Sequence, residues 1–421
     1  MQVDADKRKQ MTATMKQLKL TQNQLSKTLR SLKEEQQALQ TALRKFDSMS
    51  KSTNFRISQM QSHGSGSLAY STLQAGLKYF MLEGVGYLSF VELGDNRNSV
   101  LVLSDPICPR DRECEFIDAF LKDRNDPVFL HISYPTAKIL GELGFCVNQL
   151  GVETIIEIQD FELTGNKKQQ LRAARNRAIK DDIKVREVFQ SDDAMMTALK
   201  RISDGWLSQK VASDSQMKLV VRPMVYIDEI DVRRFVAIKD NKIIGFVVFD
   251  PMYKNKQVIG YIANQLRSNY EKGFSVVDYI ILEAMQVFKD EGKTEISLGL
   301  SPMYKVDDGH EFKHSKLLKA HFNYAFEKAN YLYNFKNLAR HKNLYRPDMK
   351  GAREDKVYCA MKTRFFLSRM LSVYKALGLN PIQKTCEHIK DVITEKFRSC
   401  FCHTRKDVHE HESDDCCSQK K

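Results

Sequence analysis

Basic residues at helical spacing are the most distinctive chemical feature of this sequence. Lys336, Arg340 and Lys342 lie four and two residues apart in one aromatic and basic segment, and Arg346 follows shortly after. Ammonium and guanidinium groups on one helix can neutralise neighbouring phosphates, so this segment is a candidate surface for a phosphate-bearing partner. A solvated basic face is the alternative interpretation.

A second basic segment covers residues 166–187 and carries Lys168 and Arg172. The apolar residues Leu171, Ala174 and Ala178 fall on one face of the helix predicted there. Two interpretations stay open for this segment. It is either a solvated helix connecting two domains or a helix that contacts phosphates.

The body of the chain lacks the usual signatures of a covalent nucleophile. It contains neither a G-x-S-x-G elbow nor a convincing Cys–His pairing. No cofactor is predicted, because an acyl-CoA enzyme needs a glycine-rich turn at a helix start and the nearest segment, RSNYEKGFS, offers one glycine. No metal site is predicted either, although the Cys and His residues of the tail (399–421) could be acylated, hold a soft metal or lie in an unstructured segment.

The stretch from Gly273 to Met303 predicts the clearest local structure. Ser275 precedes Asp278 by three residues, which is a capping-box pattern, and a helical apolar face follows. Gly292 ends the predicted helix because glycine readily adopts the left-handed conformation found at helix ends. TEISLGLSPM then predicts a strand that runs into a loop.

Strands and helices alternate on both sides of this stretch, which predicts an α/β fold. Segments such as SVLVLSDPICP and PVFLHISY indicate strands of a first domain over residues 69–165. A second domain is predicted over residues 188–362, with a hairpin that turns at Asp240–Asn241. Both domains share one order of elements, which indicates an internal duplication.

The N-terminal segment, residues 1–50, carries apolar residues alternately three and four apart. This pattern predicts a coiled coil and therefore a homo-oligomer, whereas a single amphipathic helix folded onto the body is the alternative. A Ser/Gly-rich flexible linker is predicted over residues 51–68. At the other end, residues 363–398 predict an amphipathic helix that lies at a membrane interface or packs on the body.

Composition narrows the class of partner. The chain has 421 residues, a formal net charge of +13 and a pI near 9.1, which favours polyanionic partners such as nucleic acid or an anionic membrane surface. No apolar run reaches the roughly 20 residues that a membrane span requires, and the N-terminus does not match a signal peptide. These features predict a cytoplasmic protein, in solution or peripheral at a membrane, in a reducing compartment.

Motifs in both halves carry a family likeness from about Tyr70 to about Ala360. The first half contains LSDPICP, LGELGF and LTGNKKQQLRAARNRA, and the second contains SDGWL, FDPMY, RSNYEKGFSVVD, SLGLSPM and LYNFKNLARHKNLYRP. In their order and spacing these motifs resemble the catalytic region of phosphatidylglycerol lysyltransferases, which are aminoacyl-tRNA-dependent lipid aminoacyltransferases. The resemblance implies two tandem acyltransferase domains of the GNAT type.

The resemblance also implies a function and a set of residues. The expected reaction moves an amino acid from aminoacyl-tRNA to a lipid hydroxyl at an anionic membrane face. Asp278, Arg267, Tyr253 and Ser301 are the catalytic candidates: Arg267 could pair with Asp278 or hold a lipid phosphate, and Tyr253 and Ser301 could donate to an oxyanion. The capping position of Asp278 explains that residue without catalysis. Asp204 and Trp206, within SDGWL, join the basic residues above as substrate or tRNA contacts. A GNAT-type enzyme that uses acyl-CoA or a peptide or amine acceptor, and a non-catalytic scaffold that binds tRNA or membrane, are the alternatives.

Overall fold

The computed structural model describes residues 2–94, 99–124, 126–189, 193–209, 217–269, 275–307, 309, 311–362 and 366–380, with residues 383, 385 and 390. It divides into two compact units, Met1–Ser58 and Gln59–Lys421. Over the described residues, every helix is too short or too polar to cross a bilayer.

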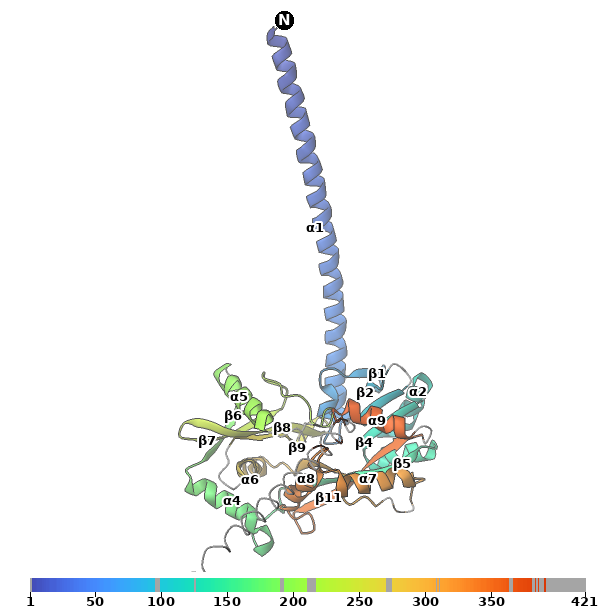
Figure 1. Cartoon of the computed structure of the whole chain (residues 1–421), viewed down its shortest axis with the longest axis vertical. Helices are drawn as coiled ribbons and strands as arrows, with labels where there is room; N and C mark the ends of the chain where they lie inside the picture. The colour runs from blue at the N-terminus through green and yellow to red at the C-terminus, as the bar shows by residue number, and fades with distance from the viewer. Residues whose placement is uncertain are drawn as a thin grey trace, which may run out of the picture. The chain divides into compact units, whose positions relative to one another are not determined.

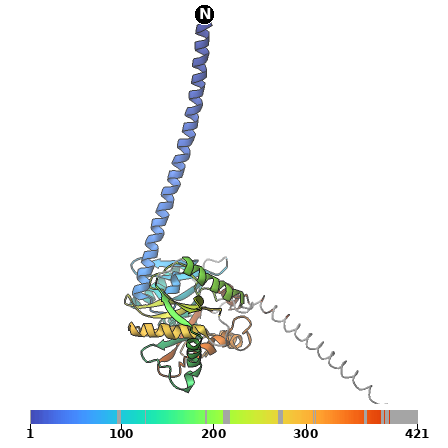
Figure 2. The same cartoon turned by 90° about the vertical axis from the view of Figure 1, so that its left-hand side faces the viewer.

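The N-terminal unit is helical throughout its described length. It belongs to one helix, α1 (Gln2–His63), which Figures 1 and 2 show as an unbroken rod. Leu25, Leu32 and Leu39 recur at intervals of seven, and each is exposed. Because α1 continues to His63, the flexible linker predicted over residues 51–68 is wrong for most of its length. The coiled coil stays a prediction.

One mixed sheet of 11 strands organises residues 59–421, in the order β1-β2-β3-β4-β11-β5-β10-β9-β8-β7-β6. The strands are β1 (Lys78–Leu82), β2 (Gly86–Glu92), β3 (Ser99–Ile107), β4 (Asp126–Ile132), β5 (Cys146–Glu157), β6 (Lys184–Val188), β7 (Arg233–Lys239), β8 (Lys242–Lys254), β9 (Gln257–Ser268), β10 (Glu295–Pro302) and β11 (Ala352–Met361).

The two halves of the sheet share one unit, a pair of parallel neighbouring strands joined through a helix, although the second half contains one more strand and additional helices. β3 and β4 are parallel neighbours joined through helix α2 (Glu113–Asp123), and β9 and β10 are parallel neighbours joined through α6 (Val276–Asp290). The last strand of each half pairs with the other half, since β5 lies beside β10 and β11 lies beside β4. This exchange makes the sheet continuous, and the predicted division into domains 69–165 and 188–362 stays a prediction.

Helices cover both faces of the sheet (Figure 1). In the second half, α4 (Gln169–Lys180) and α6 pack on the face that carries Phe235 and Phe249, whereas α5 (Asp193–Gln209) packs on the face that carries Val236 and Phe246. In the first half, α2 and α3 (Tyr134–Glu142) cover one face. The opposite face holds α7 (Lys316–Lys328), α8 (Phe335–Asn343) and α9 (Phe366–Ala376).

Several local predictions are confirmed. Ser275 is the N-cap of α6, and its hydroxyl accepts a hydrogen bond from the backbone N–H of Asp278 at 3.2 Å. Gly292 follows the helix with φ +74, the left-handed value predicted for its role. The β7–β8 hairpin turns at Asp240 and Asn241, both with positive φ.

Other elements differ from the prediction. Residues 166–187 form a helix only to Lys180, and β6 follows it as an edge strand. β11 lies in a segment that showed no clear strand pattern. The interfacial interpretation of the tail helix is wrong for α9, because Met370, Val373 and Leu377 are buried in the core. The tail 399–421 and its cysteines lie outside the described residues.

Candidate functional site

A cavity of about 440 Å³ opens where the two halves of the sheet meet. Its walls come from β4, β9, β10, the first turn of α6, the end of α8, Trp206 of α5 and the segment 217–221. Most of the lining is aliphatic or aromatic. Its titratable lining residues are His131, Arg267, Tyr333, His341 and Lys342. An apolar cavity with a few convergent polar groups is the usual form of a ligand site.

Two β-bulges place groups in this cavity. On β4, His131 is the extra residue between Leu130 and Ile132 opposite β11, and it has φ +59. On β10, the register shifts across Gly299, which has φ +76. Glycine accepts this left-handed conformation without strain, and here it leaves room beside the Lys342 amino group. Bulges of this kind commonly re-aim side chains near active sites.

Lys342 carries a buried amino group at the cavity wall. The residue is 5% exposed, and its Nζ donates to the Leu300 carbonyl at 2.6 Å. Burial lowers the pKa of Lys342 to about 7, although the nearby Glu153 carboxylate opposes this shift. The structure therefore corrects the predicted basic surface, because Lys342 faces the interior and not the exterior beside Arg340.

Arg267 is a second buried cation, at the end of β9. Its guanidinium lies 3.8 Å from the Trp206 ring, donates to Gln265 Oε1 at 2.6 Å and donates to the Leu266 carbonyl at 2.9 Å. Burial lowers the pKa of Arg267 to about 10, so the group stays charged at neutral pH. Within the described part of the chain, no carboxylate forms an ion pair with it. A buried charge normally requires a partner, and the cavity can supply an anionic one.

Asp278 and His341 form a coupled pair at the base of α6. His341 Nε2 lies 2.7 Å from Asp278 Oδ1, which also accepts from the Tyr345 hydroxyl at 2.8 Å. Burial would raise the pKa of Asp278, but the His341 charge and these hydrogen bonds outweigh it and lower the pKa. Burial would likewise lower the pKa of His341, and the attraction of Asp278 outweighs it and raises the pKa.

A second carboxylate–histidine pair consists of Glu153 on β5 and His131 on β4. Glu153 Oε2 is 3.7 Å from His131 Nε2, and the Ser297 hydroxyl donates to the other carboxylate oxygen. The same Ser297 oxygen accepts from the Gly299 N–H at 2.8 Å, which fixes the β10 bulge. The carboxylate is thereby held close to the cavity without lining it.

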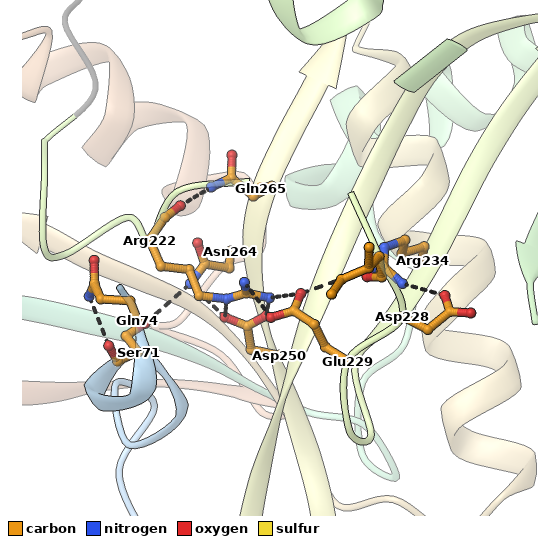
Figure 3. A network of polar contacts seen from close by, with 10 residues as sticks. Ser71, Gln74, Arg222, Asp228, Glu229, Arg234, Asp250, Asn264 and Gln265 are labelled. Atoms are coloured by element: carbon orange, nitrogen blue, oxygen red, sulfur yellow. Dashed lines mark hydrogen bonds and ion pairs between the residues drawn. The ribbon is translucent and has the colours of Figure 1, made fainter. Parts of the chain in front are cut away.

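An ion network holds the chain in place directly after residues 217–221, which form part of the cavity wall (Figure 3). Arg222 binds Asp250 through Nε and Nη2 at 2.7 and 2.6 Å and binds Glu229 at 2.9 and 3.0 Å. Asn264 donates to Asp250 at 2.8 Å. The Gln265 amide donates to the Arg222 carbonyl while its oxygen accepts from Arg267. The network thus connects the wall segment to the cation of the cavity.

Three cavity residues keep polar atoms without a hydrogen-bond partner among the described residues. These atoms are both ring nitrogens of His131, Asn264 Oδ1 and Arg267 Nε, and all three residues are buried. A buried polar atom without a partner is costly, which indicates that a ligand or water occupies the cavity in use.

Several predicted site residues lie elsewhere. Tyr253 is buried and donates to Asp231 at 2.6 Å, and Ser301 is buried in β10. Neither lines the cavity, so the geometry gives no support to their predicted role as oxyanion donors. Asp204 is exposed on α5, whereas Trp206 lines the cavity.

The basic candidates divide into structural and free groups. Lys336 pairs with Glu327 at 2.7 Å, and Arg346 pairs with Asp348. Lys168 is buried, donates to the Glu162 carbonyl and lies 3.7 Å from the Phe161 ring, while Arg172 donates to the carbonyls of Leu163 and Gly165. Arg340 is exposed on α8 and forms no hydrogen bond or ion pair with the described residues.

Sequence reasoning missed His131, His341, Asn264 and Arg222. A signal existed for His131, because burying a polar imidazole inside the apolar strand PVFLHISY costs free energy unless the ring has a partner or a function. His341 had no such signal, because its partner Asp278 lies 63 residues away. Across the described residues, no group of three or more His, Cys, Asp or Glu side chains could hold a metal ion.

Comparison with known proteins agrees with the resemblance. The model of the family described as "Phosphatidylglycerol lysyltransferase, C-terminal" matches residues 57–354. Phosphatidylglycerol lysyltransferase of Bacillus subtilis (strain 168) is 24% identical over 309 residues, which cover 71% of this chain and 34% of that protein. The enzyme of the same name from Staphylococcus xylosus is 26% identical over 269 residues, covering 62% and 30%. The chain therefore spans about a third of the length of these relatives.

Solved structures share the fold. L-PGS from Bacillus licheniformis superposes with a TM-score of 0.61 at 19% identity, covering 77% of this chain and 96% of that one. The C-terminal domain of a putative lysylphosphatidylglycerol synthetase from Agrobacterium fabrum gives a TM-score of 0.61 at 18% identity, covering 79% and 97%. At these identities the similarity establishes the mixed α/β fold alone.

Proposed function

We propose a function from one premise: the chain belongs to the phosphatidylglycerol lysyltransferase C-terminal family. The proposed reaction transfers an aminoacyl group from aminoacyl-tRNA to a hydroxyl of a phosphatidylglycerol-like lipid. The observation that supports it most directly is the apolar cavity that holds the buried cations Arg267 and Lys342.

Alcoholysis of an ester in this way requires positioned reactants and a donor for the oxyanion of the tetrahedral intermediate. Lys342 supplies a suitable donor, since its amino group is held by the Leu300 carbonyl in an apolar setting where a hydrogen bond to an oxyanion is strong. Gly299 beside it allows a substrate carbonyl to approach closely. No covalent enzyme intermediate is needed.

Arg267 supplies a site for the phosphodiester of the lipid. Its charge has no carboxylate partner among the described residues, and the Trp206 ring and Gln265 fix the plane of the guanidinium. A planar, oriented guanidinium suits the bidentate recognition of a phosphate. The aliphatic walls from β9, β10 and α6 suit the adjoining apolar part of the acceptor.

The tRNA contact is proposed for the exterior of α8. Arg340 is the exposed cation there, and Lys336 on the preceding turn is partly neutralised by Glu327. This surface adjoins the cavity because His341 and Lys342 of the same helix line it. The acceptor stem could therefore bind outside while the aminoacyl ester enters the cavity.

The test is transfer by the purified chain. Vesicles of phosphatidylglycerol are incubated with aminoacyl-tRNA, and the extracted lipid is analysed by mass spectrometry. We expect an aminoacylated lipid, and about a 10²-fold lower rate for Lys342→Met, as when an oxyanion donor is removed. Lys305→Met is the matched control, because Lys305 pairs with Glu354 outside the cavity lining and should keep the wild-type rate.

Two results would contradict the proposal. One is the lack of any aminoacylated lipid with every aminoacyl-tRNA tried, despite folded protein. The other is thermal stabilisation by CoA thioesters but not by aminoacyl-tRNA, which would favour an acyl-CoA-dependent transferase.

A further inference from the structure

His341 occupies the position of a general base in the cavity. Its ring borders the cavity and its side chain is 29% exposed, so a reactant can reach it. One ring nitrogen, Nε2, is engaged with Asp278 Oδ1 at 2.7 Å. The other nitrogen, Nδ1, forms no hydrogen bond with the described residues.

The Asp278 carboxylate holds the His341 ring in one orientation. The carboxylate is 1% exposed at the start of α6, and the Tyr345 hydroxyl donates to the same oxygen at 2.8 Å. The backbone N–H of Asp278 is fixed by the Ser275 cap. A carboxylate that accepts from Nε2–H leaves the lone pair of the neutral imidazole on Nδ1, the nitrogen that can accept a proton.

We propose that His341 is the general base of the transfer and that Asp278 is its positioning residue. This inference rests on the proposed function. The acceptor hydroxyl gives its proton to His341 Nδ1 while its oxygen forms the new bond to the aminoacyl carbon. The bond from that carbon to the ribose oxygen then breaks, and the ribose oxygen takes the proton from His341. No proton is gained or lost overall, and no oxidant or further reactant is required.

The surroundings of the ring favour this role. Asp278 on α6 attracts the imidazolium, and Lys342 on α8 repels it. The balance raises the pKa of His341 above its ordinary value, so the protonated intermediate is stabilised. The other titratable groups around the cavity are Tyr333, Tyr345, Arg267 and His131.

Lys342 is the competing candidate for the base, and the structure gives it a different contact. Its Nζ donates to the Leu300 carbonyl, and the carboxylate that attracts its charge is that of Glu153 and not that of Asp278. The two candidates can therefore be separated by experiment. Removing the charge of Asp278 should move the pKa of His341 and leave that of Lys342 nearly unchanged.

The test compares transfer rates over pH 5.5–9 for the full-length wild type, His341→Gln, His341→Ala and Asp278→Asn. His341→Gln keeps an N–H donor for Asp278 but cannot act as a base, and we expect kcat about 10²–10⁴-fold lower with KM nearly unchanged. Added imidazole should restore part of the activity of His341→Ala. His321→Gln is the matched control, because His321 bonds the Tyr374 hydroxyl at 2.6 Å outside the cavity lining.

Asp278→Asn should shift the rising limb of the pH–rate profile to lower pH, because the attraction that raises the pKa of His341 is lost. A wild-type rate in His341→Gln would overturn the inference while the proposed function stands. The inference would also be overturned if Asp278→Asn did not shift the pH–rate profile and imidazole did not restore activity to His341→Ala. An inactive wild type would instead remove the proposed function, and the inference with it.

Discussion

The ion network around Arg222 leads to a strong prediction about stability. Arg222 is 3% exposed and Asp250 is fully buried, and the two make a bidentate pair (Figure 3). Glu229 makes a second bidentate contact with the same guanidinium. Replacing Arg222 by methionine keeps most of the side-chain volume and removes every one of these donors.

The expected cost follows from what remains. Among the described residues, Asp250 would keep only the Asn264 amide at 2.8 Å, and Glu229 would keep Arg234 at 3.5 Å. Leaving a buried charge without its partner typically costs about 3–5 kcal/mol, far more than the net value of the intact pair. We therefore expect Arg222→Met to lower the free energy of unfolding of residues 59–421 by about this amount. Asp250→Leu combined with Arg222→Met should recover part of the loss.

The assay uses a favourable property of the sequence. Trp206 is the single tryptophan of the chain and lies in the cavity wall, so urea unfolding followed by its fluorescence reports on this unit and not on α1. Arg112→Met is the control, because Arg112 makes a similar two-nitrogen contact with Glu115 but is exposed. Its unfolding midpoint should stay close to that of the wild type.

A midpoint for Arg222→Met no lower than that for Arg112→Met would refute this reasoning. It would mean that the buried carboxylates find other partners or water at little cost. An unchanged midpoint for the double variant relative to Arg222→Met alone would contradict the narrower claim that Asp250 carries the penalty.

Three further predictions concern titration and assembly. His341 has a raised pKa, so the wild type should lose stability relative to His341→Gln as pH rises from 6.5 through that pKa. Urea unfolding at several pH values measures this, and a difference in unfolding free energy that stays constant with pH would contradict it. Lys342 has a pKa of about 7 against 10.5 when unfolded, so wild-type stability should rise between these pH values relative to Lys342→Met, and a flat difference would argue against burial of its charge. The exposed heptad stripe of α1 should make the chain a homo-oligomer in light scattering; Leu32→Glu should shift it towards monomer and Gln40→Glu should not.

Local structure was largely predictable from the sequence because short-range chemistry determines it. The Ser275 cap, the Gly292 helix end and the turn at Asp240 each depend on the conformational preferences of one or two residues. The α/β class followed from the alternation of elements. The β11 strand was missed because the first half of its segment, AREDKVYCAM, is rich in charged residues and its strand partners β4 and β5 lie far earlier in the chain.

The candidate site was predictable only in part. Arg267, Trp206 and Lys342 do line one cavity, and Asp278 bonds His341 in its wall, but Lys342 was predicted to belong to an exposed basic surface. Lys342 is instead buried. The spacing of basic residues along a helix does not show which of them face the interior, because that depends on what the helix packs against. The His341–Asp278 pair depends on the docking of α8 against α6, which no local pattern encodes.

The exchange of last strands explains why the cavity draws on both halves of the sheet. β4 and β10 hold equivalent positions, since each follows a helical crossover and each pairs with the last strand of the other half. Each also carries a bulge at the cavity, His131 in β4 and Gly299 in β10. The two halves nevertheless differ chemically there, because one bulge adds an imidazole and the other adds space beside Lys342. Similar strand frameworks in the two halves thus produce an asymmetrical site, with space beside the Lys342 amino group at β10 and an imidazole at β4.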